Sequence, residues 1–137
     1  MPAVTYLNPE THIAPPGRFS HVAIAEPGRL AFVAGQVALD EDGVLVGPND
    51  PAAQFPQVFR NLKTILEGIG AGFTDIVELT TYLVGEDSRQ PWLDTRDAVY
   101  AEHFPDGAYP PNTLLIISGL VRPEMKVEVS AIVRLPG

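Results

Sequence analysis

The order of the predicted elements indicates an α+β fold, in which a mixed β-sheet carries two helices on one face. Two stretches repeat apolar residues at helical spacing, a β-rich stretch separates them, and further strand-like stretches precede and follow them. The resulting order β-β-α-β-α-β-β implies a mixed sheet with both helices packed on the same side. The chain has 137 residues, 45% of them hydrophobic, which suits one domain spanning residues 1–137.

Two strands are expected before the first helix. Pro15-Pro16-Gly17 closes an irregular leader, and residues 19–25 then alternate apolar with small or polar side chains. A turn at residues 26–29 predicts that a second strand, residues 30–39, pairs back on the first. The acidic residues 40–43 lack the ligand spacing of an EF-hand, so we interpret them as a turn rather than a calcium site.

Both helices carry boundary signals. Asp50 followed by Pro51 is typical of a capped helix start, and Gly68 is typical of a helix end. One apolar stripe runs along this first helix, with charged side chains off it. Residues 76–84 form the β-rich run. The second helix has Pro91 near its start and a mixed stripe, so we expect it to pack on one side only.

Two further strands, residues 113–117 and 125–135, complete the predicted sheet. The run Leu114-Leu115-Ile116-Ile117 is too hydrophobic for an exposed strand, although one layer of two helices covers only one face of a sheet. A second covering layer is therefore expected on the other face.

Composition excludes several classes of function. A net charge of −8 without a basic run argues against binding nucleic acid, because that affinity comes largely from neutralising phosphates. The absence of cysteine excludes thiolate chemistry, disulfides and zinc–thiolate sites, and no metal-binding histidine pair or dinucleotide fingerprint is present. No apolar run is long enough for a membrane span and no signal peptide is visible. We expect a cytoplasmic protein with neither cofactor nor metal.

Several segments resemble one family in the order in which that family has them. Residues 109–117 (YPPNTLLII) and 126–133 (KVEVSAIV) resemble the C-terminal strand pair of the RidA (YjgF/YER057c/UK114) family, and residues 17–22, 30–40 and 99–104 add to the likeness. The resemblance implies a YjgF/chorismate-mutase-like fold. It also implies a homotrimer with ligand clefts between neighbouring subunits, which would supply the missing cover, and hydrolysis of enamines or imines.

The resemblance also implies roles for residues of the last two strands. Glu128 takes the position of a glutamate that positions the attacking water, so it is the predicted catalytic residue; the alternative is a solvated glutamate paired with Lys126 or an arginine. Asn112 takes the position of the arginine that binds the substrate carboxylate, and an amide lacks the charged bidentate fork of arginine. Either the cleft accepts a neutral or differently oriented ligand, or Asn112 only caps its loop.

Further differences from the family lie near the predicted cleft. Phe19 replaces a tyrosine and so removes a hydroxyl, and Ala34, before Gly35, replaces a serine that is common there. Arg18 is able to restore a positive charge to the cleft, although a solvated surface position is the ordinary fate of such a residue. We therefore predict that Arg18, Phe19, Ala34, Gly35 and Asn112 contact substrate.

Two functions follow from this reading. The first is a cofactor-free hydrolase of the enamine/imine deaminase type that acts on a small metabolite, with weak or no activity on the 2-iminobutyrate that archetypal members hydrolyse. The alternative is a trimer that binds a small metabolite without catalysis.

Overall fold

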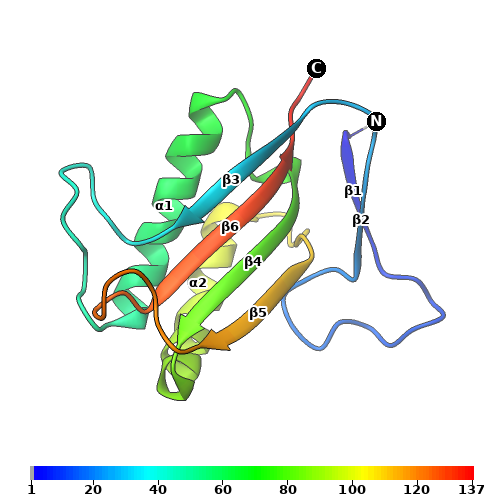
Figure 1. Cartoon of the computed structure of the whole chain (residues 1–137). Helices are drawn as coiled ribbons and strands as arrows, with labels where there is room; N and C mark the ends of the chain where they lie inside the picture. The colour runs from blue at the N-terminus through cyan, green and yellow to red at the C-terminus, as the bar shows by residue number, and fades with distance from the viewer. Residues whose placement is uncertain (1) are drawn as a thin grey trace.

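The computed structural model describes residues 2–137 and contains the predicted mixed sheet. Its strand order is β3-β6-β4-β5, with β4 and β5 parallel and the other pairs antiparallel. Both helices lie behind this sheet in Figure 1, on the same face, which confirms the predicted α+β fold. The elements are β3 (Leu30–Gln36), α1 (Pro51–Gly68), β4 (Ile76–Val84), α2 (Arg89–His103), β5 (Asn112–Ile117) and β6 (Val127–Arg134).

The first two strands form a separate antiparallel pair beside the sheet (Figure 1). β1 (Val4–Leu7) pairs with β2 (Val22–Ala25), with Val4 opposite Ala25 and Leu7 opposite Val22. The prediction of an irregular leader was therefore wrong, because that segment contains β1. The prediction that β3 pairs back on the preceding strand was also wrong, because β3 is hydrogen-bonded to β6 instead.

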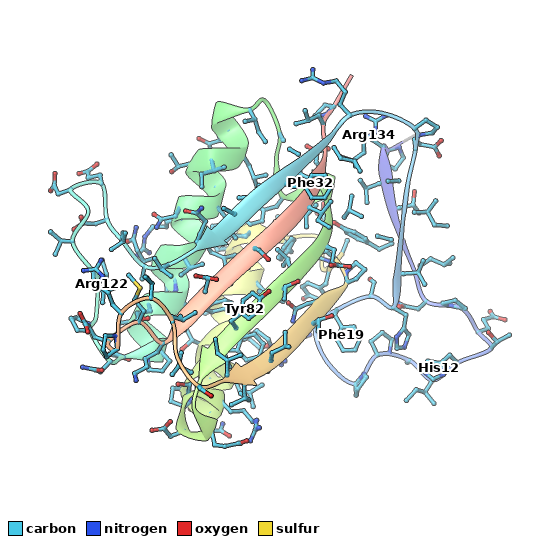
Figure 2. The ribbon with its side chains drawn as sticks, in the orientation of Figure 1. His12, Phe19, Phe32, Tyr82, Arg122 and Arg134 are labelled. Carbon is cyan, nitrogen blue, oxygen red and sulfur yellow. The ribbon has the colours of Figure 1, made fainter. Side chains whose placement is uncertain are left out.

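Contacts between residues far apart in sequence explain this pairing. Arg134 at the end of β6 is only 7% exposed, and its guanidinium donates to the backbone oxygens of Glu26, Pro27 and Leu135. A Cβ atom on Gly28 would lie 2.3 Å from Arg134 Cζ, so the turn is wrapped tightly around the guanidinium. Figure 2 shows Arg134 near the chain that leads into β3. The turn thus separates β2 from β3 instead of joining them as a hairpin.

The core lies between the helices and the sheet. α1 begins as predicted, with Asp50 Oδ1 accepting a hydrogen bond from Ala53 N at 3.2 Å. Gln54 is fully buried. Its side-chain Nε2 donates hydrogen bonds to the backbone oxygens of Gly47 and Glu124, at 2.9 and 2.8 Å, and these bonds connect α1 to the loop before β6. Fully buried apolar side chains come from α1, β4 and β6: Phe55, Val58, Phe59, Leu62, Ile76, Leu79, Leu83, Val127, Val129 and Val133.

Within the described part of the chain, no helix covers the opposite face of the sheet, which we call the open face (Figure 1). Because side chains alternate along a strand, Glu128 and Ile132 of β6 point to this face, together with their cross-strand neighbours Tyr82 and Phe32. Phe32 is 73% exposed (Figure 2). Among residues 2–137, no helix is both long and apolar enough to cross a membrane.

Candidate functional site

Three of the predicted substrate-binding residues line one small pocket beside β5. This β5 pocket has a volume of about 210 Å³ and is formed by the loop between β1 and β2, one side of α2 and the start of β5. Phe19, which belongs to that loop, lies next to β5 in Figure 2. The lining residues are Pro16, Gly17, Arg18, Phe19, Trp92, Arg96, Tyr100, Asn112 and Leu114.

Asn112 is fixed in this pocket by a neighbouring strand. It is the first residue of β5 and pairs in register with Leu79 of β4. Its Oδ1 accepts a hydrogen bond of 2.8 Å from Oγ1 of Thr81, which is 1% exposed. The amide oxygen is therefore occupied, while the amide NH₂ has no partner among the described residues and is free to donate to a ligand.

Two guanidinium groups converge next to Asn112. The Nε atoms of Arg18 and Arg96 lie 3.2 and 3.3 Å from Oδ1 of Asp97. The hydrogen bond from Arg18 holds the pKa of the Asp97 carboxyl below its ordinary value, and Asp97 in turn raises the pKa of Arg18. Two cations and one carboxylate leave one net positive charge at the pocket.

Sequence reasoning considered Arg18 but missed Arg96. The signal was present, because Arg96 stands on the recurring face of α2 with Trp92 and Tyr100, where a charged residue is unusual. In the structure its guanidinium lies over the Trp92 ring, 5.6 Å from the centroid, and its side chain is 21% exposed. A cation on an otherwise apolar helix face therefore marked the pocket.

Aromatic rings form the floor of the β5 pocket. Trp92 and Tyr100 are 4% and 2% exposed, and both pack on Phe55 of α1, with ring centroids at 5.5 and 6.3 Å. Burial raises the pKa of Tyr100, so its phenol stays neutral. The floor is therefore rigid and apolar, and Trp92 Nε1 is a buried donor with no acceptor among residues 2–137.

The predicted catalytic residue lies elsewhere in the subunit. Glu128 extends from β6 over Gly35 of β3, where an added Cβ would come within 2.4 Å of Glu128 Oε2. The β3–β6 register shifts between Val33 and Gln36, so Ala34 and Gly35 form an irregular step in the strand. Ala34 and Gly35 are both exposed there, and Gly35 lies against the Glu128 carboxylate.

Asn112 and Glu128 lie on opposite faces of the sheet. Asn112 bonds to Thr81, whose buried side chain is on the helix side of β4 together with that of Leu79. Glu128 stands opposite Tyr82, the next residue of β4, and adjacent residues of a strand point to opposite faces. One chain alone therefore does not bring these two side chains to a common ligand.

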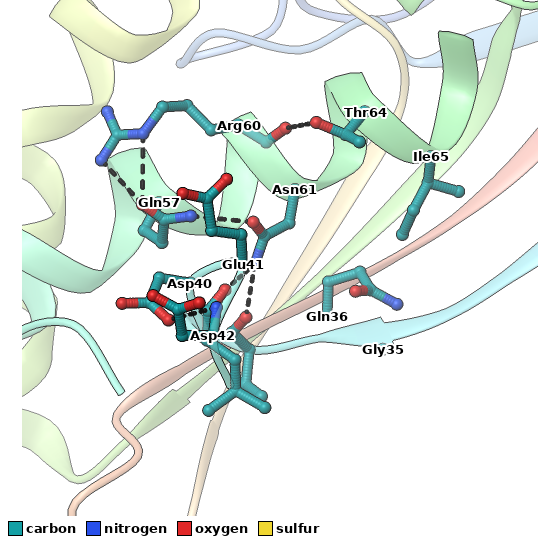
Figure 3. A pocket seen from close by; sticks show the side chains of 12 residues that line it. Gly35, Gln36, Asp40, Glu41, Asp42, Gln57, Arg60, Asn61, Thr64 and Ile65 are labelled. Atoms are coloured by element: carbon teal, nitrogen blue, oxygen red, sulfur yellow. Dashed lines mark hydrogen bonds between the residues drawn. The ribbon is translucent and has the colours of Figure 1, made fainter. Parts of the chain in front are cut away.

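A larger groove of about 820 Å³ lies between the end of β3, the following acidic loop and α1 (Figure 3). Its polar groups are largely paired with one another: Arg60 donates to Gln57 Oε1 at 3.1 and 3.2 Å, and Asn61 donates to the backbone oxygens of Val37 and Leu39. Of the predicted site residues only Gly35 reaches it, so we place the candidate site at the smaller β5 pocket and at Glu128. Within the described part of the chain, no three His, Cys, Asp or Glu side chains are placed to hold a metal ion.

Comparison with known proteins assigns the chain to a family. The family model described as Endoribonuclease L-PSP matches residues 9–135. The chain belongs to the Rid (YjgF/YER057c/UK114) family. A Rid-family protein of unknown function from Yersinia pestis, YyfB, has a similar crystal structure, with a TM-score of 0.85 and 35% identity over 97% of this chain and 99% of that chain.

More distant Rid structures share the fold. RidA from an Antarctic Psychrobacter is 24% identical, with a TM-score of 0.66 over 89% of this chain and 92% of its own. TdcF from E. coli, solved with bound serine, is 21% identical, with a TM-score of 0.68 over 91% of each chain. At this level of identity the likeness concerns the fold alone.

Proposed function

We propose that this Rid protein is a cofactor-free hydrolase of the enamine/imine deaminase type, which acts on a small metabolite in clefts between the subunits of a homotrimer. The observation that carries the proposal is the carboxylate of Glu128, which lies over Gly35 on the open face of the sheet, within reach of a ligand. The resemblance of residues 109–117 and 126–133 to the RidA family implies the same reaction class.

A trimer would solve two problems of the isolated subunit. The open face exposes large apolar side chains, including Leu30, Phe32 and Leu115, and burying apolar surface stabilises by roughly 25 cal/mol per Å². A neighbouring subunit packed on this face would also carry its own β5 edge toward Glu128, so that Asn112 of one copy and Glu128 of another share a cleft. Analytical ultracentrifugation tests the assembly, and a stable monomer at micromolar concentration would contradict it.

The proposed reaction needs only a base and a positioned imine. For a protonated imine, Glu128 takes a proton from water as the water oxygen bonds to the carbon of the C=N group and the C=N π electrons move to nitrogen, which gives a neutral tetrahedral carbinolamine. The same carboxyl then gives this proton to nitrogen. The C–N bond breaks and ammonia leaves with the bonding pair, while the Glu128 carboxylate takes the hydroxyl proton as the C=O bond forms. The aromatic floor of the β5 pocket keeps water away from the rest of the substrate.

A second function, binding a small metabolite without turnover, rests on Asn112. Asn112 stands where the family resemblance expects a carboxylate-binding arginine, and E. coli TdcF shows that a protein of this fold holds a small amino acid. Ribonuclease activity, which the family description names, is not part of the proposal, because a chain of net charge −8 repels phosphate backbones.

Ammonia release decides between hydrolysis and binding. We expect the protein to release ammonia from freshly generated imines of small amino acids, more slowly for 2-iminobutyrate than an arginine-bearing Rid protein does, and Glu128→Gln to abolish the release. The variant should keep its oligomeric state and thermal stability, since Glu128 is not part of the core. If no imine is hydrolysed, or if Glu128→Gln is as fast as wild type, the hydrolase proposal fails.

A further inference from the structure

We propose that Arg96 and Arg18 together form the carboxylate anchor of this protein and that its ligands are small monocarboxylates with a flat apolar tail. The positive charge that the family resemblance places at position 112 would come instead from helix α2 and from the loop between β1 and β2. This inference rests on the proposed function for the location of the site, but it concerns binding and does not require turnover.

The geometry leaves both guanidinium groups with free donors. Arg18 and Arg96 each use Nε on the single oxygen Oδ1 of Asp97. Within residues 2–137, the terminal nitrogens of Arg96 have no hydrogen-bond acceptor, and those of Arg18 have only the nearby Tyr109 hydroxyl, although each group carries four N–H donors there. Two adjacent guanidinium groups with free N–H donors are able to bind the two oxygens of a carboxylate. The NH₂ of Asn112 adds a neutral donor on the same wall, suited to a carbonyl oxygen next to the carboxylate.

Burial makes Arg96 the stronger of the two contacts. Its side chain is 21% exposed against 48% for Arg18, and its guanidinium is held over the ring of Trp92. Partial removal from water strengthens the attraction to an anion, and a side chain already fixed by packing loses less entropy when the anion binds. Arg18 is more exposed and contributes mainly charge.

The rest of the pocket sets the shape of the ligand. Phe19, Trp92, Tyr100 and Leu114 present rings and an aliphatic side chain, so the part of the ligand beyond its carboxylate meets apolar surface. The volume of about 210 Å³ is below the range of drug-sized pockets, which limits the ligand to a small molecule. Phenylpyruvate has the required carboxylate, 2-oxo group and flat tail, and phenylacetone is its neutral counterpart without the carboxylate.

Asp97 competes with the ligand for both cations. Its carboxylate is 58% exposed and belongs to the outer edge of the cluster. Asp97→Asn removes the competing charge and should tighten phenylpyruvate binding severalfold, whereas loss of either arginine should weaken it. Because the two kinds of variant change the phenylpyruvate affinity in opposite directions, the comparison distinguishes an anion-binding site from a general loss of packing.

Calorimetric titration with phenylpyruvate and phenylacetone tests the inference. We expect Arg96→Gln and Arg18→Gln each to weaken phenylpyruvate binding about tenfold or more, because hydrogen bonds to charged groups are lost, and to leave phenylacetone binding unchanged. Arg60→Gln is the matched control, since Arg60 lines the separate groove at α1 and should have no effect. Phenylpyruvate affinity of the wild type should fall as salt is added.

Three results would overturn the anchor. These are wild-type binding of phenylacetone as tight as that of phenylpyruvate, unchanged phenylpyruvate affinity in both arginine variants, or an equal loss in Arg60→Gln. If Arg96→Gln does not fold, the exposed Arg18→Gln decides. Arginine-dependent binding of phenylpyruvate without imine hydrolysis would support the carboxylate anchor and contradict the hydrolase proposal. Hydrolysis of an uncharged imine without phenylpyruvate binding would support the hydrolase proposal and contradict the arginine anchor.

Discussion

The carboxylate of Glu128 occupies the space that a side chain at position 35 would need, with Oε2 only 2.4 Å from the place of a Cβ atom on Gly35. Glycine at position 35 is therefore what allows Glu128 to lie across β3. The contact joins the end of β3 to the start of β6, at the step where the register between the two strands shifts.

Gly35→Ala is expected to displace the Glu128 carboxylate and to slow imine hydrolysis about tenfold or more, because a shift of about 1 Å in a catalytic group is costly. Stability should change little, since the displaced atoms are the end of a flexible, partly exposed side chain. Gly68→Ala is the control, because its added methyl group meets no atom within 4 Å. If the Gly35→Ala variant releases ammonia at the wild-type rate, the position of the Glu128 carboxylate over Gly35 is not needed for the reaction.

Asn112→Arg adds a third guanidinium to the β5 pocket. We expect it to lower the dissociation constant of 2-oxobutyrate by about tenfold, while loss of the hydrogen bond from Thr81 costs about 1 kcal/mol of stability. Thr81→Val loses the same hydrogen bond without adding charge, so it should lose stability and gain no affinity. If Asn112→Arg gains no affinity in titration calorimetry, residue 112 does not face the ligand.

Arg134→Ala should destabilise the protein by about 2–4 kcal/mol, because it removes the donor for three backbone oxygens and leaves a void inside the turn before β3. Urea unfolding measures the loss, and amide hydrogen exchange should show faster opening of β2. Arg122→Ala, at an exposed position of the loop before β6 (Figure 2), should change stability by less than about 0.5 kcal/mol. Equal unfolding midpoints for the two variants would contradict this role of Arg134.

His103 should make stability depend on pH. Burial lowers the pKa of His103, and the nearby Glu102 opposes this only in part, so at neutral pH the folded state holds the imidazole uncharged against the rings of Phe59 and Phe73. The unfolded chain has a histidine pKa of about 6.5, so it binds more protons than the folded state below that pH. The contribution of His103 is therefore complete above about pH 6.5 and is lost as the pH falls through the folded pKa.

The comparison with His103→Phe isolates this contribution, because the other titrating groups are common to both proteins and cancel in the difference. The unfolding free energy of His103→Phe minus that of wild type should rise as the pH is lowered from about 7.5 to about 5.5. A difference that stays constant over this range would show that His103 is protonated alike in the folded and unfolded states.

Local signals in the sequence were enough to predict the helices and the central strands. The cap at Asp50 and the apolar stripe that follows define α1, and the β-rich run at residues 76–84 coincides with β4. The alternation of side chains along β6 places Glu128 on the face opposite its valine neighbours. Periodicity and capping depend on residues a few positions apart, so they are readable without the fold.

Pairings between distant segments were not readable in this way. The turn at residues 26–29 places Pro27 and Gly28 between two strand-like stretches, which suggests a hairpin, yet Arg134, more than a hundred positions later, holds it in a shape that leaves β2 to pair with β1. The placement of Asn112 and Glu128 on opposite faces likewise depends on the registers of β5 and β6 against β4.

The sequence by itself determined the element order and the helix-covered sheet, because these follow from periodicity and capping over a few residues, and its resemblance to the Rid family pointed to Asn112 and Glu128 as the residues to examine. Only the tertiary structure decided which charges surround Asn112. Arg18, Arg96 and Asn112 come from a loop, a helix and a strand that meet only when α2 packs beside β5, and no local pattern reports a contact made by three separate segments.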